Sequence, residues 1–164
     1  MQDQHFDEWV VAAGPRLHRS AYLLTGDWAT AQDLVQHALV ETWTKWGAVE
    51  APDAYARSVM VRAISRWWRR RWRTDIELEP ERTTSEADVE PWAAVYERDA
   101  VLRALLRLPP KQRAVLVLRF YDDLTERQAA DALGWPIGTV KSTTSRALSA
   151  LRSQTGLDRL EAWQ

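Results

Sequence analysis

Residues 136–152 contain polar and basic side chains that could bind nucleic acid. Placed on a helix, this stretch directs hydroxyl, ammonium and guanidinium groups outward from Thr139, Lys141, Ser142, Ser145 and Arg146. These donors suit phosphate oxygens and the edges of base pairs. The chemistry expected of them is reversible hydrogen bonding and charge neutralisation, with no covalent step.

A second basic row is expected on a helix over residues 53–73, where seven basic residues accompany one acid. Arg62, Arg66, Arg69 and Arg73 recur at helical spacing, with Arg70 nearby. Because guanidinium can bind two phosphate oxygens at once, a polyanion is the favoured ligand. An acidic protein partner or an anionic lipid surface is the alternative, although the aromatic residues of this helix are needed to close a small core.

Residues 108–152 are expected to hold the first basic row within a helix-turn-helix. Thr125 and Gln128 form a capping-box pattern, and Gly134 stands where one helix must end and the backbone must turn. Ala130 and Val140 fall where the two helices approach closely and where the second helix enters the core. The alternative is an ordinary helical hairpin with a solvated outer face.

Helical periodicity also predicts two helices at the start of the chain. The first covers residues 5–24, where Gly14-Pro15 is expected to kink or divide it, and the second covers residues 28–46 with Asp27 as its cap. The outer face of the second helix carries Asp33, Gln36, His37 and Val40. From the pattern alone, Asp33 and Gln36 are interpreted as solvated.

The predicted fold is all-α, with two small helical domains joined by a flexible acidic linker. Residues 74–91 contain seven acids, one base and two prolines, and separate an N-terminal domain (1–73) from a C-terminal domain (92–158). The C-terminal domain is expected to open with helices at 92–108 and 111–121, followed by the helix-turn-helix. Arg119 is placed away from the core face of the helix at 111–121.

The composition excludes several kinds of site. The chain has no cysteine, so disulfides and thiolate metal sites are excluded. His5, His18 and His37 lack the spacing of metal ligands, and neither a phosphate-cradling glycine loop nor a nucleophile elbow is present. We therefore expect no enzyme activity, no metal and no cofactor. No apolar run is long enough to span a bilayer, and no signal-peptide pattern is present, so we expect no membrane insertion.

Three stretches together resemble the extracytoplasmic-function group of bacterial sigma factors: DLVQHALVETW (33–43), the arginine-rich helix at 54–73, and residues 108–152. The match in order, spacing and length covers nearly the whole chain. It implies a cytoplasmic promoter-specificity subunit that acts at the nucleoid, with core RNA polymerase and promoter DNA as its partners. An anti-sigma factor is a further partner in this family.

The resemblance also implies roles for individual residues. Asp33 and Gln36 match the positions that face polymerase, and residues 47–53 resemble the loop that holds a flipped base. The positions that meet the −10 strand are Arg62, Ser65, Arg66 and Arg69, with Arg70 and Arg73 from the same basic row. The expected contacts with the −35 duplex come from Arg119, Thr139, Lys141, Ser142, Ser145 and Arg146.

The chain departs from the family pattern at three positions. Arg62 stands where Asn is common, Arg66 where Asp is common, and Thr143 where an Arg often supplies a phosphate contact. The chain also stops soon after Arg152, without the extra C-terminal domain of some members. A stand-alone DNA-binding regulator would share the helix-turn-helix, and a protein-interaction module would share only the helices. The basic helix and residues 33–43 favour the sigma factor over both.

Overall fold

The computed structural model describes residues 2–73 and 100–155, in which every regular element is a helix. This confirms the predicted all-α fold. The chain divides into two compact units, Met1–Arg82 and Thr83–Gln164. The predicted linker at 74–91 lies outside the described residues, so its bounds stay a prediction. Within the described ranges, no helix has both the length and the hydropathy needed to cross a bilayer.

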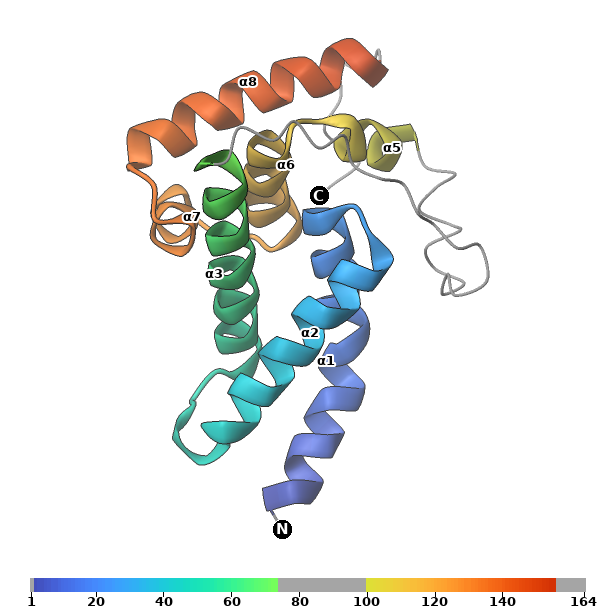
Figure 1. Cartoon of the computed structure of the whole chain (residues 1–164), viewed down its shortest axis with the longest axis vertical. Helices are drawn as coiled ribbons and strands as arrows, with labels where there is room; N and C mark the ends of the chain where they lie inside the picture. The colour runs from blue at the N-terminus through green and yellow to red at the C-terminus, as the bar shows by residue number, and fades with distance from the viewer. Residues whose placement is uncertain (1, 74–99, 156–164) are drawn as a thin grey trace. The chain divides into compact units, whose positions relative to one another are not determined.

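The first unit is a bundle of three long helices and one short helical turn. In chain order these are α1 (Gln2–Thr25), α2 (Trp28–Thr44), the 3₁₀ helix η1 (Trp46–Ala48) and α3 (Pro52–Arg73). α2 lies beside both α1 and α3, and α1 also contacts α3 (Figure 1). The core of the bundle forms where apolar side chains of the three long helices meet, and it includes Leu24, Val35, Ala38, Met60, Ile64 and Trp68. Burial of this apolar surface holds the bundle together.

The turn between α1 and α2 follows the sequence prediction. Gly26 adopts a positive φ of 71° after the end of α1, and Asp27 caps α2. The Asp27 carboxylate accepts a hydrogen bond from the backbone N–H of Thr30 at 2.7 Å, which satisfies one of the free donors at the start of the helix. The predicted cap is therefore confirmed.

Gly14-Pro15 was expected to kink or divide the first helix, and of these two outcomes the division is wrong. α1 continues through Pro15 as one helix of 24 residues. Proline removes the N–H that would bond to the carbonyl of Val11, but both residues lie on the exposed side of α1, where water can satisfy that carbonyl. Packing of α1 against α2 and α3 favours the continuous helix.

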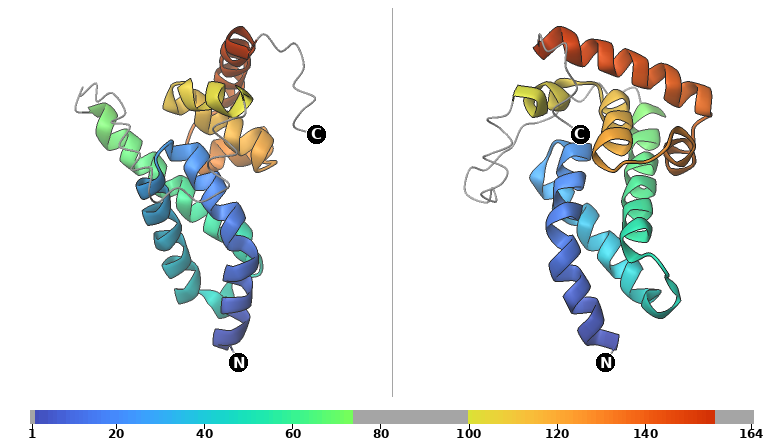
Figure 2. Two further views of the ribbon diagram at one scale, coloured as in Figure 1. Left: turned by 90° about the vertical axis from the view of Figure 1, so that its right-hand side faces the viewer. Right: turned by 180° about the vertical axis from the view of Figure 1, so that it is seen from behind.

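The second unit packs its shorter helices against one long helix. Its elements are α5 (Ala100–Arg107), α6 (Pro110–Leu116), the π-helical turn η2 (Val117–Tyr121), α7 (Glu126–Leu133) and α8 (Ile137–Thr155). α5, α6 and α7 all contact α8 (Figure 2). Their shared core includes Leu105, Val115, Leu118, Leu133 and Val140. The predicted helix at 92–108 is described from Ala100 onward.

The junction between α7 and α8 has the features expected of a helix-turn-helix. The Thr125 hydroxyl accepts a hydrogen bond from the backbone N–H of Gln128 at 3.1 Å, and the Gln128 side chain accepts one from the N–H of Thr125 at 2.8 Å. Gly134 closes α7 with a φ of 69°, a conformation that costs glycine little because it has no Cβ. The predicted capping box and glycine turn are both confirmed.

Candidate nucleic-acid interface

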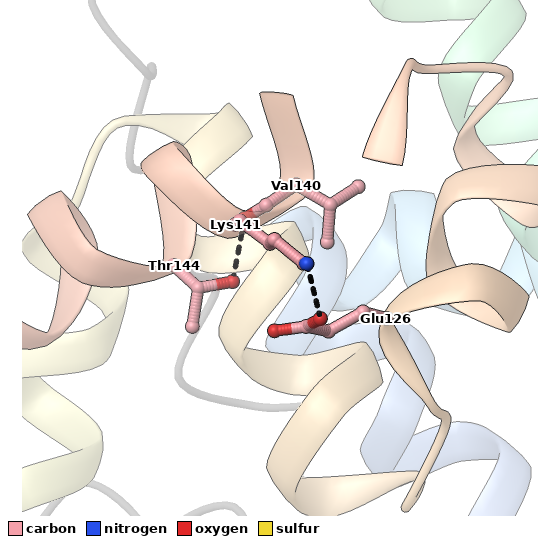
Figure 3. Close-up of polar contacts among 4 residues, drawn as sticks. All are labelled: Glu126, Val140, Lys141 and Thr144. Atoms are coloured by element: carbon pink, nitrogen blue, oxygen red, sulfur yellow. Dashed lines mark hydrogen bonds and ion pairs between the residues drawn. The ribbon is translucent and has the colours of Figure 1, made fainter. Parts of the chain in front are cut away.

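α8 presents a polar outer row because its inner face is fixed in the core of the second unit. Val140 is fully buried, and the hydroxyl of Thr144 donates to the Val140 carbonyl at 2.7 Å (Figure 3). The residues predicted to contact the −35 duplex on this helix are all exposed: Thr139, Lys141, Ser142, Ser145 and Arg146. Because the inner face of α8 is buried and these polar residues are exposed on the other side, its outer face can enter a DNA groove while the core stays covered.

Lys141 forms an ion pair across the helix-turn-helix. Its ammonium lies 3.8 Å from the carboxylate of Glu126, which stands in the first turn of α7 (Figure 3). Both side chains are open to solvent, so the pair contributes little to stability. The ion pair instead affects the position of Lys141, because it holds the ammonium near the start of α7.

The guanidinium of Arg146 is held along the surface of α8 by Ser142. The Nε of Arg146 donates to the Ser142 carbonyl at 3.3 Å, and its Nη2 donates to the Ser142 hydroxyl at 3.4 Å. That hydroxyl donates in turn to the carbonyl of Thr139 at 3.2 Å. Ser142 therefore orients the arginine as well as belonging to the exposed row.

Arg119 lies differently from the other residues predicted to contact the −35 duplex. Its side chain is half-buried, and its Nη1 donates to the carbonyl of Leu124, in the loop that precedes α7. Its guanidinium carbon lies 5.8 Å from the centre of the Phe120 ring, and its buried Nε has no hydrogen-bond partner among the described residues. Arg119 therefore helps to close the loop between η2 and α7.

Thr143 does not belong to the outer row of α8. Its side chain is only 8% exposed, between the buried residues Val140 and Ala147 on the inner face. From the sequence, Thr143 was expected to stand in place of an outward phosphate-binding arginine. A longer arginine here would have to extend from a buried Cβ before its guanidinium reached solvent.

α3 directs its arginines away from the core of the first unit. Arg62, Arg66, Arg69 and Arg70 are exposed, and the side chain of Arg73 lies outside the described residues. The Nε of Arg62 donates to the Ser58 carbonyl at 3.2 Å. The Nε of Arg69 donates in the same way to the carbonyl of Ser65 at 3.4 Å, which leaves its terminal nitrogens facing outward.

The structure separates Ser65 from the arginines with which the sequence grouped it. Ser65 is 5% exposed, and its buried hydroxyl has no hydrogen-bond partner within the described part of the chain. Ser65 follows Val61 by four residues and precedes Trp68 by three, and both of these side chains are buried in the core. Helical geometry therefore turns Ser65 toward them and away from the exposed basic row.

The outer face of α2 contains the two residues predicted to face polymerase and an apolar neighbour. Asp33 and Gln36 are exposed, as is His37. Val40 lies one turn further along this face and is 59% exposed. Sequence reasoning placed Val40 on this face without assigning it a role. A single exposed aliphatic residue is ordinary on a protein surface, so the sequence carries no signal for Val40 beyond its place on the same face as Asp33 and Gln36.

Comparison with known proteins matches both units to one family. A family model of Sigma-70 region 2 matches residues 9–74, and one of Sigma-70 region 4 matches residues 98–151. The RNA polymerase sigma-E factors of Streptomyces avermitilis and Streptomyces coelicolor are each 38% identical over 161 residues. This alignment covers 96% of the chain and 88% or 89% of those relatives.

Two solved structures share the fold. The sigma factor RpoE from Bartonella quintana, in complex with the anti-sigma factor NepR, has a TM-score of 0.66 at 24% identity. That match covers 95% of this chain and 99% of the other. CnrH, in complex with the cytosolic domain of CnrY, has a TM-score of 0.61 at 20% identity, and the match covers 96% and 91% of the two chains.

Proposed function

This chain belongs to the extracytoplasmic-function sigma factors of bacterial RNA polymerase, and from that premise we propose how its helices divide the work. It directs promoter-specific initiation of transcription by RNA polymerase. Members of this family are non-catalytic regulators of the polymerase, and in our proposal every site of this chain binds a partner without catalysis. The protein acts in the bacterial cytoplasm, on polymerase and nucleoid DNA.

In this proposal α8 reads the −35 element as duplex DNA. The observation that supports this role is the exposed row of mixed donors on α8. The row is held in place because Val140, on the inner face of α8, is buried and because α7 begins with a capping box. Lys141 and Arg146 supply the charged donors that suit guanine and phosphate, and Thr139, Ser142 and Ser145 add shorter hydroxyl contacts. Arg119 contributes from the edge of this surface, after release of its bond to the Leu124 carbonyl.

The proposed partner of α3 is the opened −10 strand. Arg62, Arg66, Arg69 and Arg70 are exposed and can neutralise its phosphates, and Arg73 extends the same row in the sequence. An unpaired base must gain stacking or a pocket to offset the lost pairing. We assign that base to residues 47–53, as the family resemblance implies. Because Ser65 is buried, we assign the strand contacts to the exposed arginines, one of which, Arg69, bonds to the backbone carbonyl of Ser65.

The outer face of α2 is proposed to bind core polymerase. Asp33 and Gln36 provide polar contacts. Val40, which lies closer to the C-terminal end of α2, adds an exposed apolar contact. Stable interfaces commonly combine a small apolar centre with a polar rim. Docking on polymerase fixes the spacing between the two units and raises the effective concentration of the second DNA contact once the first is made.

The test is initiation from defined templates with purified core polymerase. Adding the chain is expected to produce transcript starts at fixed positions. These starts should be lost when only the −35 sequence of the template is changed, and also when only the −10 sequence is changed. No stimulation of initiation by an active core on any genomic template would contradict the proposal. A stand-alone regulator would instead bind its duplex tightly without polymerase.

Asp33→Ala is expected to weaken binding of the chain to core polymerase, because it removes a charged contact from the α2 face. The expected loss is about 1–2 kcal/mol, the scale of one important interface residue. It is measured by titrating labelled chain with core polymerase. Duplex −35 binding by the chain alone should stay unchanged. Unchanged core affinity in both Asp33→Ala and Val40→Asp would reject the α2 interface.

We also propose an anti-sigma factor as a regulatory partner, supported by the solved complex of the Bartonella quintana sigma factor with NepR. Such a partner should bind the purified chain and lower its affinity for core polymerase in a competition titration. If no product of a neighbouring gene competes with polymerase, this part of the proposal fails while the promoter-reading roles stand.

A further inference from the structure

A cluster of four aromatic rings lies where residues 47–53 leave the end of α2 and η1. Phe6 and Trp9 come from α1, Trp43 from α2 and Trp46 from η1. The Phe6 ring meets Trp43 edge to face at 4.8 Å between centroids, and meets Trp46 in the same way at 5.0 Å. Trp9 lies 5.3 Å from Trp46 and 5.6 Å from Phe6. Trp46 directly precedes residue 47, so the cluster holds the first end of the segment.

The other end of the segment, Asp53, is held by Trp9 of α1. The indole Nε1 of Trp9 donates to Oδ1 of Asp53 at 2.9 Å, and Asp53 stands in the first turn of α3. The ring of Trp9 therefore contacts Trp46, which directly precedes the segment, and its N–H binds Asp53, the last residue of the segment. This hydrogen bond joins residues 44 positions apart in the sequence.

The middle of the segment, residues 49–51, lies between η1 and α3 and belongs to neither helix. None of residues 47–53 is buried, and only Val49 and Pro52 are half-buried. A short exposed segment without core residues depends on its anchors for its shape. Holding both ends in place removes conformational freedom before a ligand arrives and so lowers the entropic cost of binding.

The cluster is not explained by core packing alone. The main core contributions of α1 come from Leu17 to Leu24, whereas Phe6 and Trp9 lie near its N-terminal end and are only half-buried. Trp43 stays 43% exposed although it belongs to the cluster. These rings are only half-buried or are exposed, and one of them, Trp9, also hydrogen-bonds to Asp53. Such rings are better suited to bracing residues 47–53 than to filling the interior.

We propose that Trp9 and Phe6 are positioning residues for the site that selects the unpaired −10 base. They act through residues 47–53 and need not touch DNA: Trp9 fixes the distance between Trp46 and Asp53, and Phe6 holds Trp46 against α1. This inference rests on the proposed function, in which residues 47–53 hold that base. It makes the N-terminal end of α1 part of promoter selection.

The test compares variants that remove the hydrogen bond from Trp9 to Asp53 with one that can keep it. Trp9→Phe keeps an aromatic ring but loses the donor, Asp53→Ala loses the acceptor, and Asp53→Asn keeps an acceptor oxygen. Holoenzyme made with each variant is tested on promoters that differ in one −10 base, with 2-aminopurine in the −10 strand reporting opening. Trp28→Phe, at the other end of α2, is the matched control for an indole lost from the same unit.

Trp9→Phe and Asp53→Ala should each reduce discrimination between the −10 bases by about threefold to tenfold, the scale of one hydrogen bond. The double variant should lose no more than either single variant, and Asp53→Asn should restore most of the preference. Affinity for core polymerase and for −35 duplex should not change. Trp28→Phe should keep the base preference even where it lowers the melting temperature.

Three results would overturn the inference: unchanged base preference in both single variants, additive losses in the double variant, or an equal loss in Trp28→Phe. The last result would mean that any weakening of the first unit has the same effect. Failure of the unmodified holoenzyme to open any promoter is a different outcome. It would reject the proposed function itself, and with it the task assigned to Trp9.

Discussion

The two basic helices, α3 and α8, present the side chains that we propose to bind nucleic acid in different ways. α8 mixes hydroxyl, ammonium and guanidinium donors in one exposed row, whereas the exposed row from Arg62 to Arg70 on α3 offers guanidinium groups. Mixed donors can distinguish base edges, while a row of arginines neutralises the phosphates of any sequence. α8 is therefore suited to reading sequence and α3 to holding a strand. In our proposal, base selection near α3 comes from another element, residues 47–53.

Val140→Asp should have the largest effect, because it removes the buried support of the reading helix. A carboxylate in this fully buried position should destabilise the second unit by about 4 kcal/mol or more. Thermal unfolding should show an early transition, and initiation that depends on the −35 element should be lost. Ser149→Asp places the same side chain on the exposed face of α8 and should leave the unfolding transition unchanged. An unaltered melting curve for Val140→Asp would contradict the assigned core position.

Replacing Arg62, Arg66 and Arg69 together by alanine tests whether α3 holds the strand without regard to sequence. We expect a loss of roughly 1 kcal/mol for each arginine, or about 3 kcal/mol in all, on every −10 sequence. The slope of log affinity against log salt for single-stranded DNA should fall by about 2, since about 0.7 is lost for each phosphate contact. A loss confined to one −10 sequence would show that α3 reads bases and would remove the contrast with α8.

Arg146→Ala tests the reading side of the comparison. If the guanidinium oriented by Ser142 contacts a base, the variant should lose about 1–3 kcal/mol on the preferred −35 element and relax specificity at one position. Competition between −35 duplexes measures this loss with holoenzyme. Arg152→Ala, six residues further along the same helix, is the control of equal charge. An equal loss on every duplex would reassign Arg146 to phosphate binding.

Glu126→Gln should have the smallest effect and would refine the role of Lys141. The ion pair is exposed, so the free energy of unfolding should change by less than about 0.5 kcal/mol. Freed from its carboxylate partner, Lys141 should bind the −35 duplex about twofold more tightly at low salt, and this gain should disappear at high salt. Asp131→Asn removes the same charge from α7, where Asp131 makes no ion pair in the described ranges. An equal gain in Asp131→Asn would attribute the effect to net charge alone.

Features specified by neighbouring residues could be predicted from the sequence. The capping box uses Thr125 and Gln128, which are three residues apart. Gly134 is itself the residue that adopts a positive φ at the turn. The cap at Asp27 is equally local. In each case the residues that determine the conformation lie within one turn of the helix they define, so no knowledge of tertiary packing was needed.

Features that depend on packing could not be predicted in the same way. Ser65 and Thr143 are polar residues on the inner faces of their helices, and their polarity in the sequence did not indicate that packing buries both. Arg119 binds a carbonyl in a loop whose path the sequence does not specify. The bond from Trp9 to Asp53 depends on how α1 and α3 pack, which no local spacing signals.

The π-helical turn η2 has a consequence for how this region of the chain can change in length. Its backbone N–H at Asp122 bonds to the carbonyl of Val117, five residues earlier, whereas an α-helix uses a four-residue step. Such a wide turn is the geometric trace of one inserted residue accommodated inside a helix. Deleting one residue between 117 and 121 would close it to an α-turn and rotate the following residues by about 100°. Because Val117 and Leu118 in this turn are fully buried, only a change of length after them, at residues 119–121, would redirect the loop before α7 and leave the core around Val115 intact.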